Sequence, residues 1–396
     1  MYGHFDKQPP FDGWFEGLGP YSPVVKDGKL YARGAADDGY ALFASVLAIA
    51  ALQEEKKPHP RVMILIEGSE ESGSRDLPYY MELIKPRIGE PDLIVCLDSG
   101  AGNYDQLWVT SSLRGIVVGD LKVSVLKEGV HSGDASGVVP SSFRIARALL
   151  SRLEDENTGD ILVKDLYAKD FEGKRRDAAR EAGKSLGDPG MINCFPWHAS
   201  TQPVSRDTAL LAENRWWKPQ LEIIGATGLP PSETAGNVLR PSTTLTLSLR
   251  LPPTVDKKMA EQCLKDVFLG TPAPHNASVE LNIWKSSQGW SAPVVAPWLD
   301  KALQESSKRN FENRPAVYQG EGGSIPFMAM LGSMLPRAQF FVCGVLGPNS
   351  NAHGPNEFLH LDFCQRVVAC VAEVLTESCT ADGHGDDRAN KMQKTS

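Results

Sequence analysis

The apolar residues in the first third of the chain form short runs separated by longer helical patterns. Val62–Ile66 and Leu93–Leu97 are continuous apolar runs, typical of strands that are covered on both faces of a sheet. Between Asp38 and Glu55 apolar residues recur with helical spacing, which predicts a largely buried helix. This alternation of strands and helices favours an α/β fold with a central, mostly parallel sheet flanked by helices.

The middle of the chain has a different pattern. Thr243–Leu251 alternates strictly between polar and apolar residues, which predicts a strand with one wet face in an antiparallel sheet. Gly119–Leu126 alternates in a similar way, and Ser141–Leu153 has the spacing of an amphipathic helix. These features predict an inserted α+β unit.

The pattern of the first third returns toward the end of the chain, at Pro297–Lys308, Phe340–Val345 and Phe363–Leu375. We therefore predict one α/β domain made of residues 1–115 and 293–380, interrupted by a lid and dimerisation domain of residues 116–292. The polar, charged residues 381–396 are predicted to be a disordered tail.

Charge and composition exclude several classes of protein. The net charge of -8 leaves no basic surplus for binding nucleic acid. No apolar run approaches the ~20 residues of a membrane helix, and the first residues lack the features of a signal peptide. The seven cysteines are scattered without a Cys-x-x-Cys pair, as expected for reduced thiols. We therefore expect a cytoplasmic protein that binds neither nucleic acid nor a membrane.

Acids and histidines fall at the ends of the predicted strands and before one helix, at His4, Asp37, Glu70, Glu71, Asp98 and His353. Taken alone, Asp98 is typical of a turn, Asp37 of a helix cap and His353 of a loop. The carboxyl ends of parallel strands, however, share one crevice. Carboxylates gathered there repel one another unless a cation joins them, so the set predicts a metal site.

The segments around these residues resemble, in order along the chain, the metal motifs of M20 metallopeptidases, namely Tyr2–Pro9, Gly34–Gly39, Glu67–Ser74, Leu97–Gly100 and Asn351–Glu357. The resemblance extends over nearly the whole chain. Within the family, the sequence is most similar to the carnosine-type and desuccinylase-like branch. Members of that family carry a substantial segment before the His-x-Asp pair of the first motif. Here only Met1, Tyr2 and Gly3 precede His4, so we expect a chain that lacks the usual N-terminal segment.

The resemblance implies two divalent metal ions per chain, zinc in the first place and manganese or cobalt as substitutes. Asp37 would bridge both ions. His4 and Asp98 would complete one site, and Glu71 and His353 the other. Two such ions can activate a shared water and polarise the scissile carbonyl.

Adjacent glutamates suit a division of labour between metal binding and proton transfer. Glu71 would bind a cation, whereas Glu70 would not bind metal and would act as the general base that takes the proton of the water. Asp6, two residues after His4, would orient that imidazole. The resemblance thus assigns catalytic roles to Glu70 and Asp6.

The resemblance also implies functional residues in the predicted lid. His131 would cross a homodimer interface and stabilise the oxyanion in the site of the partner. Asn237 and Arg250 would bind the carboxylate of the substrate, for which a guanidinium offers a bidentate fork. Gly323 and Ser324 belong to a loop that resembles the substrate loop of the family.

The predicted function is hydrolysis of dipeptides at the bond next to a free C-terminal carboxylate. The alternatives are an N-acyl amino acid deacylase, a succinyl-diaminopimelate desuccinylase-like hydrolase, or a non-catalytic truncated dimer. Carnosine-type relatives often carry arginine where this chain has Gly320, and lysine where it has Gly39, so substrate preference is left open. The chain contains neither a Gly-x-Ser-x-Gly elbow nor a phosphate-binding P-loop.

Overall fold

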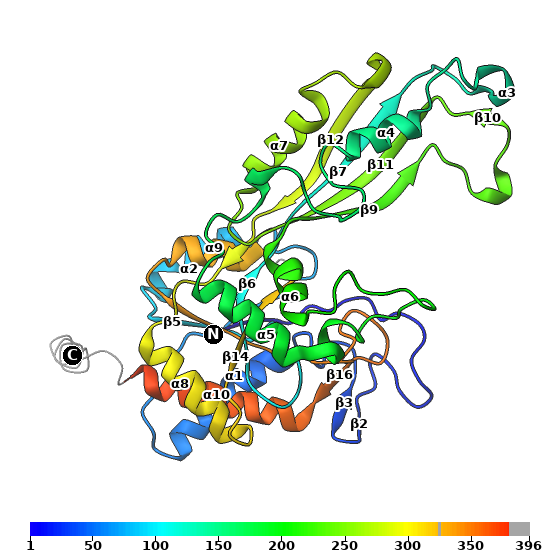
Figure 1. Ribbon diagram of the computed structural model, residues 1–396. Helices are drawn as coiled ribbons and strands as arrows, with labels where there is room; N and C mark the ends of the chain where they lie inside the picture. Colours follow the sequence, from blue (N-terminus) through cyan, green and yellow to red (C-terminus); the bar gives the residue numbers. More distant parts are fainter. Residues whose placement is uncertain (324–325, 380–396) are drawn as a thin grey trace.

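The computed structural model describes residues 1–323 and 326–379, which form a body and a lid (Figure 1). The body contains the parallel sheet, Met1 and the last described helix, and the lid extends from it as a long antiparallel sheet with helices on one side. The predicted tail of residues 381–396 lies outside the described residues. Within the described ranges, no helix is long and apolar enough to cross a membrane.

The parallel sheet of the body has the strand order β15-β5-β1-β4. Its strands are β1 (Tyr2–His4), β4 (Leu65–Glu67), β5 (Leu93–Cys96) and β15 (Gln339–Val342). Helices cover both faces, α1 (Tyr40–Glu54), α8 (Pro297–Asn310) and α10 (Leu361–Ser378) on one, and α2 (Leu77–Ile88) and α9 (Pro326–Met334) on the other. Val95 and Phe341 enter the first core, whereas Ile94 and Phe340 enter the second. The predicted parallel sheet with flanking helices is confirmed.

The prediction that the helix after Asp38 is largely buried is wrong. One side of α1 is buried, including Ala41, Ala44 and Ala48. On the other side, Phe43 is 61% exposed and Leu47 is 58% exposed. The small residues pack against β1 and α10, because only short side chains allow that close approach, while the larger ones line an apolar groove beside α10.

The sheet of the lid is antiparallel and has the strand order β12-β7-β11-β9. Its strands are β7 (Gly115–Ser124), β9 (Gln220–Thr227), β11 (Ser242–Leu251) and β12 (Ser278–Ser287). The helices α4 (Ser142–Leu150) and α7 (Lys257–Leu269) cover one face. Leu245, Leu247 and Leu249 of β11 are buried there, as the alternation of the sequence predicts.

Smaller elements connect the body and the lid or extend them. The strands are β2 (Val24–Lys26), β3 (Lys29–Tyr31), β6 (Trp108–Leu113), β8 (Val130–His131), β10 (Val238–Leu239), β13 (Trp290–Ser291), β14 (Val317–Glu321) and β16 (Phe358–His360). The helices are α3 (Ser132–Ala135), α5 (Lys174–Met191) and α6 (Thr208–Trp217), with 3-10 turns at Lys164–Leu166, Ser232–Thr234 and Pro274–Asn276. Ala182 of α5 and Trp216 of α6 share the core of the body, although both lie within the predicted lid segment. The division at residues 116–292 stays a prediction.

Candidate metal centre

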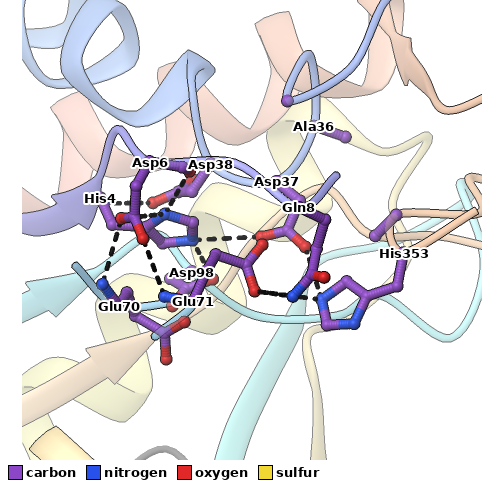
Figure 2. Close-up of polar contacts among 12 residues, drawn as sticks. His4, Asp6, Gln8, Ala36, Asp37, Asp38, Glu70, Glu71, Asp98 and His353 are labelled. Carbon is purple, nitrogen blue, oxygen red and sulfur yellow. Dashed lines mark hydrogen bonds and ion pairs between the residues drawn. The ribbon is translucent and has the colours of Figure 1, made fainter. Parts of the chain in front are cut away.

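The predicted metal ligands lie together at the carboxyl edge of the parallel sheet (Figure 2). His4 ends β1, and Asp98 lies just beyond the end of β5. Glu71 lies in the turn that follows β4. Asp37 lies between β3 and α1, and His353 lies in the loop between β15 and β16. The topology of the sheet therefore delivers ligands from distant parts of the chain to one edge.

Asp37 stands at the centre of the cluster, and its two carboxylate oxygens face different histidines. Its Oδ1 lies 3.1 Å from Nε2 of His4, and its Oδ2 lies 3.1 Å from Nε2 of His353. Oδ1 of Asp98 lies 3.7 Å from Nε2 of His4, and Oε2 of Glu71 lies 3.6 Å from Nε2 of His353. Within each of these two groups all ligand atoms lie within 4.8 Å of one another. A carboxylate that belongs to both groups has the position of a bridging ligand.

The chemistry of these donors fits divalent transition-metal ions. Imidazole nitrogen combined with carboxylate oxygen suits zinc and also manganese or cobalt. Oε1 of Glu71 is buried and has no hydrogen-bond partner among the described residues. A cation held by Asp37, Glu71 and His353 would give this oxygen a partner. The side chain of His353 is 64% exposed, so the site is open to solvent on that side.

The carboxylates shift the pKa values of both histidines upward. Burial lowers the pKa of His4, but hydrogen bonds to Asp37 and Asp98 outweigh burial and raise it to about 12. A hydrogen bond to Asp37 raises the pKa of His353. Burial raises the pKa of Asp37, but hydrogen bonds to the two histidines hold it well below its usual range. The cluster therefore concentrates negative charge that favours bound cations.

Asp6 holds the turn that carries both predicted functional glutamates. Its Oδ1 accepts a hydrogen bond from the backbone N–H of Glu70 at 3.1 Å, and its Oδ2 accepts one from that of Glu71 at 3.0 Å. Its Oδ1 also lies 3.4 Å from Nδ1 of His4. Burial and the charge of Asp98 raise the pKa of Glu70 to about 8. A carboxyl group with this pKa is suited to exchange protons near neutral pH.

Glu321 and Glu357 both contact loops of the cluster, although the sequence patterns predicted no role for either. Oε1 of Glu321 accepts hydrogen bonds from the backbone N–H of Gly100 at 2.8 Å and from the hydroxyl of Ser99 at 2.9 Å, next to Asp98. Glu357 is fully buried and contacts the loop before α1. A glutamate is usually solvated, so its residue type alone does not predict a buried role. The only signal in the sequence was position, because Glu357 ends one of the metal motifs and Glu321 lies just before the predicted substrate loop.

The predicted residues at the tip of the lid lie beside each other and away from the cluster. β8 pairs with β10, and the N–H of Ser132 donates to the carbonyl of Asn237 at 2.9 Å. The side chain of His131 is 68% exposed, and its Nδ1 lies 3.6 Å from Oδ2 of Asp134. Figure 1 shows this tip, marked by α3 and β10, at the end of the lid remote from the body.

The other predicted substrate contacts lie at the base of the lid. Nη1 of Arg250 donates to the carbonyl of Gly322 at 3.4 Å, beside the predicted substrate loop. Gly323 is exposed, and its carbonyl accepts a hydrogen bond from the N–H of Arg114 at 3.1 Å. Ser324 lies outside the described residues. The structure therefore brings Arg250 to this loop and keeps both apart from the tip of the lid.

Residues 1–377 match the peptidase family M20/M25/M40, a range that includes every candidate metal ligand. The chain belongs to this family. The recognition made from the motifs is thereby confirmed, and the protein is a metallopeptidase. The solved YXEP protein of Bacillus subtilis, which matches with a TM-score of 0.51 and 13% identity over 95% of this chain and 79% of that one, is described as a dinuclear metal-binding peptidase of the M20 family.

The peptidase is similar to several dipeptidases. It is 27% identical over 390 residues to a cysteinylglycine-S-conjugate dipeptidase of Corynebacterium striatum, an alignment that covers 95% of this chain and 80% of that protein. It is 33% identical over 171 residues to a human beta-Ala-His dipeptidase, covering 42% of this chain and 33% of that protein. The solved structure of the di-peptidase Dug1p from Saccharomyces cerevisiae matches with a TM-score of 0.71 and 21% identity, over 95% of this chain and 78% of that one. The structural likeness shows a shared fold.

Proposed function

We propose that the peptidase hydrolyses dipeptides at the bond next to a free C-terminal carboxylate, using two divalent cations per chain. The observation that carries this proposal is the position of Asp37, whose two oxygens face the two histidine-containing groups. Relatives that align with most of the chain are named dipeptidases. We propose zinc as the native metal, with manganese or cobalt as substitutes.

The arrangement divides the chemistry between cations and side chains. Cations bound by such a pair of sites lower the pKa of a water molecule and polarise the scissile carbonyl. Glu70 takes the proton of that water and delivers it to the departing amine, a task for which its raised pKa of about 8 is suited. Asp6 accepts a hydrogen bond from the backbone N–H of Glu70 and orients the imidazole of His4 at its Nδ1, which would leave Nε2 free to bind a cation.

Arg250 is the proposed partner of the substrate carboxylate. Burial lowers the pKa of its guanidinium, and its hydrogen bond goes to the carbonyl of Gly322 rather than to a carboxylate. A half-buried arginine in this state favours an incoming anion. We propose that Gly323 and Ser324 of the adjacent loop also contact the substrate, and that Asn237 joins them from the lid tip of a second chain.

We infer that the active form is a homodimer in which His131 of one chain reaches the metal site of the other. Within one chain, His131 is exposed at the lid tip, whereas the candidate ligands gather in the body. The edge strand β9 pairs with β11 on one side, and its Ile224 is 60% exposed. An open edge with exposed apolar residues favours association with a second chain.

A cytoplasmic location is the proposal that fits the cysteines. All seven are free thiols, and Cys96, Cys343 and Cys370 are buried. Free, buried thiols are typical of proteins from reducing compartments. Cell fractionation tests this location, and recovery of the protein from a secreted or periplasmic fraction would contradict it.

A substrate comparison tests the proposed reaction. The protein, dialysed against Zn²⁺, is offered dipeptides, the same dipeptides with amidated C-termini, N-acyl amino acids and succinyl-diaminopimelate. We expect the highest kcat/KM on unmodified dipeptides and a loss of at least about tenfold on amidation, because the charged pair with Arg250 is lost. Faster turnover of N-acyl substrates would instead indicate a deacylase. Failure of the folded protein to bind metal would indicate a non-catalytic dimer.

A further inference from the structure

Glu357 reaches from the loop of His353 to the loop of Asp37. Its side chain is 0% exposed. Oε1 accepts hydrogen bonds from the backbone N–H groups of Ala36 at 2.9 Å and Asp37 at 3.0 Å. Oε2 accepts one from the N–H of Gly34 at 2.7 Å. One carboxylate therefore fixes the backbone of the turn that presents the shared ligand.

Arg33 makes the reciprocal connection. Its side chain is 1% exposed, and its Nη1 lies 2.6 Å from Oε2 of Glu357. Nη1 also donates to the carbonyl of Ala352, and Nη2 donates to the carbonyl of Gly354 at 2.6 Å. These two carbonyls flank His353 in the chain. The guanidinium therefore fixes the backbone on both sides of that ligand.

The two loops are thus joined by reciprocal contacts, in which a side chain of each loop binds the backbone of the other. Each loop carries one candidate ligand and one member of a buried ion pair that holds the other loop, although the paired residues are 324 positions apart. Breaking a buried pair by removing one partner is strongly unfavourable, so the pair keeps both loops in one arrangement. We propose that Arg33 and Glu357 form a positioning unit that sets the spacing of Asp37 and His353 for cation binding.

This inference rests on the proposed metal-dependent function and predicts how strongly each of the two cation sites depends on Glu357. Asp37 belongs to both candidate metal groups, so movement of its loop alters both cation sites. Glu321, in contrast, contacts the loop of Asp98, which belongs to one group. Loss of the charge of Glu357 should therefore weaken both sites together.

Calorimetric titration of the metal-free, full-length protein with Zn²⁺ tests the proposal. In Glu357→Gln, the amide NH₂ must face at least one backbone N–H, because both oxygens of Glu357 accept from backbone donors. We expect both dissociation constants to rise by about 10- to 100-fold, the usual effect of losing a residue that orients metal ligands. Arg33→Lys keeps the charge but cannot reproduce the planar fork, and we expect it to weaken binding at the site of His353 more than at the other.

Glu213→Gln is the matched control. Glu213, on α6, is also buried, and it accepts hydrogen bonds from Arg176 at 3.1 Å and Arg180 at 2.6 Å, both on α5. Neither helix carries a candidate metal ligand. The variant should bind Zn²⁺ with wild-type constants while circular dichroism reports any loss of stability.

The outcomes separate the two proposals. If the wild type binds no Zn²⁺, the proposed function fails and this inference fails with it. If the wild type binds Zn²⁺ and folded Glu357→Gln does so with unchanged constants, or with one constant changed, the positioning role alone is overturned. If Glu357→Gln does not fold, Arg33→Lys decides the question, and unchanged binding in that variant overturns the role.

Discussion

The candidate metal centre and the tip of the lid each contain a histidine with acidic neighbours, but these neighbours come from different distances along the chain. His4 is 1% exposed, and its ring lies close to the carboxylates of Asp6, Asp37 and Asp98, which come from separate loops. The side chain of His131 is 68% exposed and lies near Asp134, three positions further along the chain. The first arrangement depends on the whole body, whereas the second is local.

This contrast shows how position in the fold separates residues of similar chemistry. Parallel strands bring the loops at their carboxyl ends to one edge, where several side chains meet inside one chain. A long antiparallel ribbon carries the residues at its tip away from the body (Figure 1). The cluster is therefore assembled within one chain, and under our proposal the tip becomes functional against a second chain.

The largest effect is expected at the cluster, from removal of the proposed base. Glu70→Gln keeps the shape of the side chain but cannot accept the proton, so kcat should fall by about 10²- to 10⁴-fold. The Zn²⁺ content should stay at the wild-type value, because Glu70 is not a proposed ligand. Steady-state kinetics with metal analysis by mass spectrometry measures both, and activity within a few-fold of wild type would exclude Glu70 as the base.

A second large effect is expected at the tip of the lid. His131→Ala should lower kcat by about 10²- to 10³-fold, the usual cost of losing an oxyanion-stabilising donor, with Zn²⁺ binding unchanged. The same kinetics and metal analysis measure this change. Nearly full activity would show that His131 is an ordinary surface residue of the tip.

Mixing the two variants tests whether the tip serves a second chain. Each mixed dimer of Glu70→Gln and His131→Ala holds one complete site, made of Glu70 from one chain and His131 from the other. Random exchange of subunits should therefore restore about a quarter of wild-type activity. Absence of any recovery after verified subunit exchange would place both residues in the site of the same chain.

A smaller and selective effect is expected from Glu321→Gln. Its carboxylate accepts hydrogen bonds from Gly100 and Ser99, so the change should loosen the loop of Asp98. One Zn²⁺ dissociation constant should rise by about 10- to 100-fold while the other stays near the wild-type value. Titration calorimetry distinguishes this result from a uniform loss at both sites, which would show that the ligand loops do not move independently.

The smallest effect is expected from Glu213→Gln, on stability rather than on chemistry. Burial raises the pKa of Glu213, but hydrogen bonds from Arg176 and Arg180 outweigh it and lower the pKa. A carboxylate with a lowered pKa stabilises the fold above its unfolded pKa, about 4.3, and this contribution disappears as the pH falls through the folded pKa.

At pH 7 the variant should lose about 1–2 kcal/mol, a modest value because both arginines are partly exposed. Urea unfolding at pH 7 and at lower pH measures the difference between variant and wild type. The difference should begin to shrink as the pH falls below about 4.3, and it should approach zero only below the folded pKa of Glu213, which lies lower, where the wild-type carboxylate is protonated too. A constant difference across this range would show that packing, rather than charge, is responsible.

Local sequence determined the type of many elements and the identity of the candidate ligands. The alternation of Thr243–Leu251 corresponds to β11, and the apolar run Leu93–Leu97 corresponds to β5. These predictions hold because side-chain period and strand burial are properties of a few consecutive residues. The candidate ligands could be predicted for a related reason, since metal chemistry restricts the residue types that can serve as ligands in each loop.

The tertiary structure alone decided which surfaces and loops meet. α1 has apolar residues on several sides, but contact with β1 and α10 buries the side that carries small residues. The pairing of Arg33 with Glu357 joins positions 324 residues apart, and nothing in either local segment specifies the other. Likewise, His131 is remote from His4 because the strands of the lid carry it outward. Such contacts depend on the three-dimensional path of the whole chain, which a local pattern of polar and apolar residues does not encode.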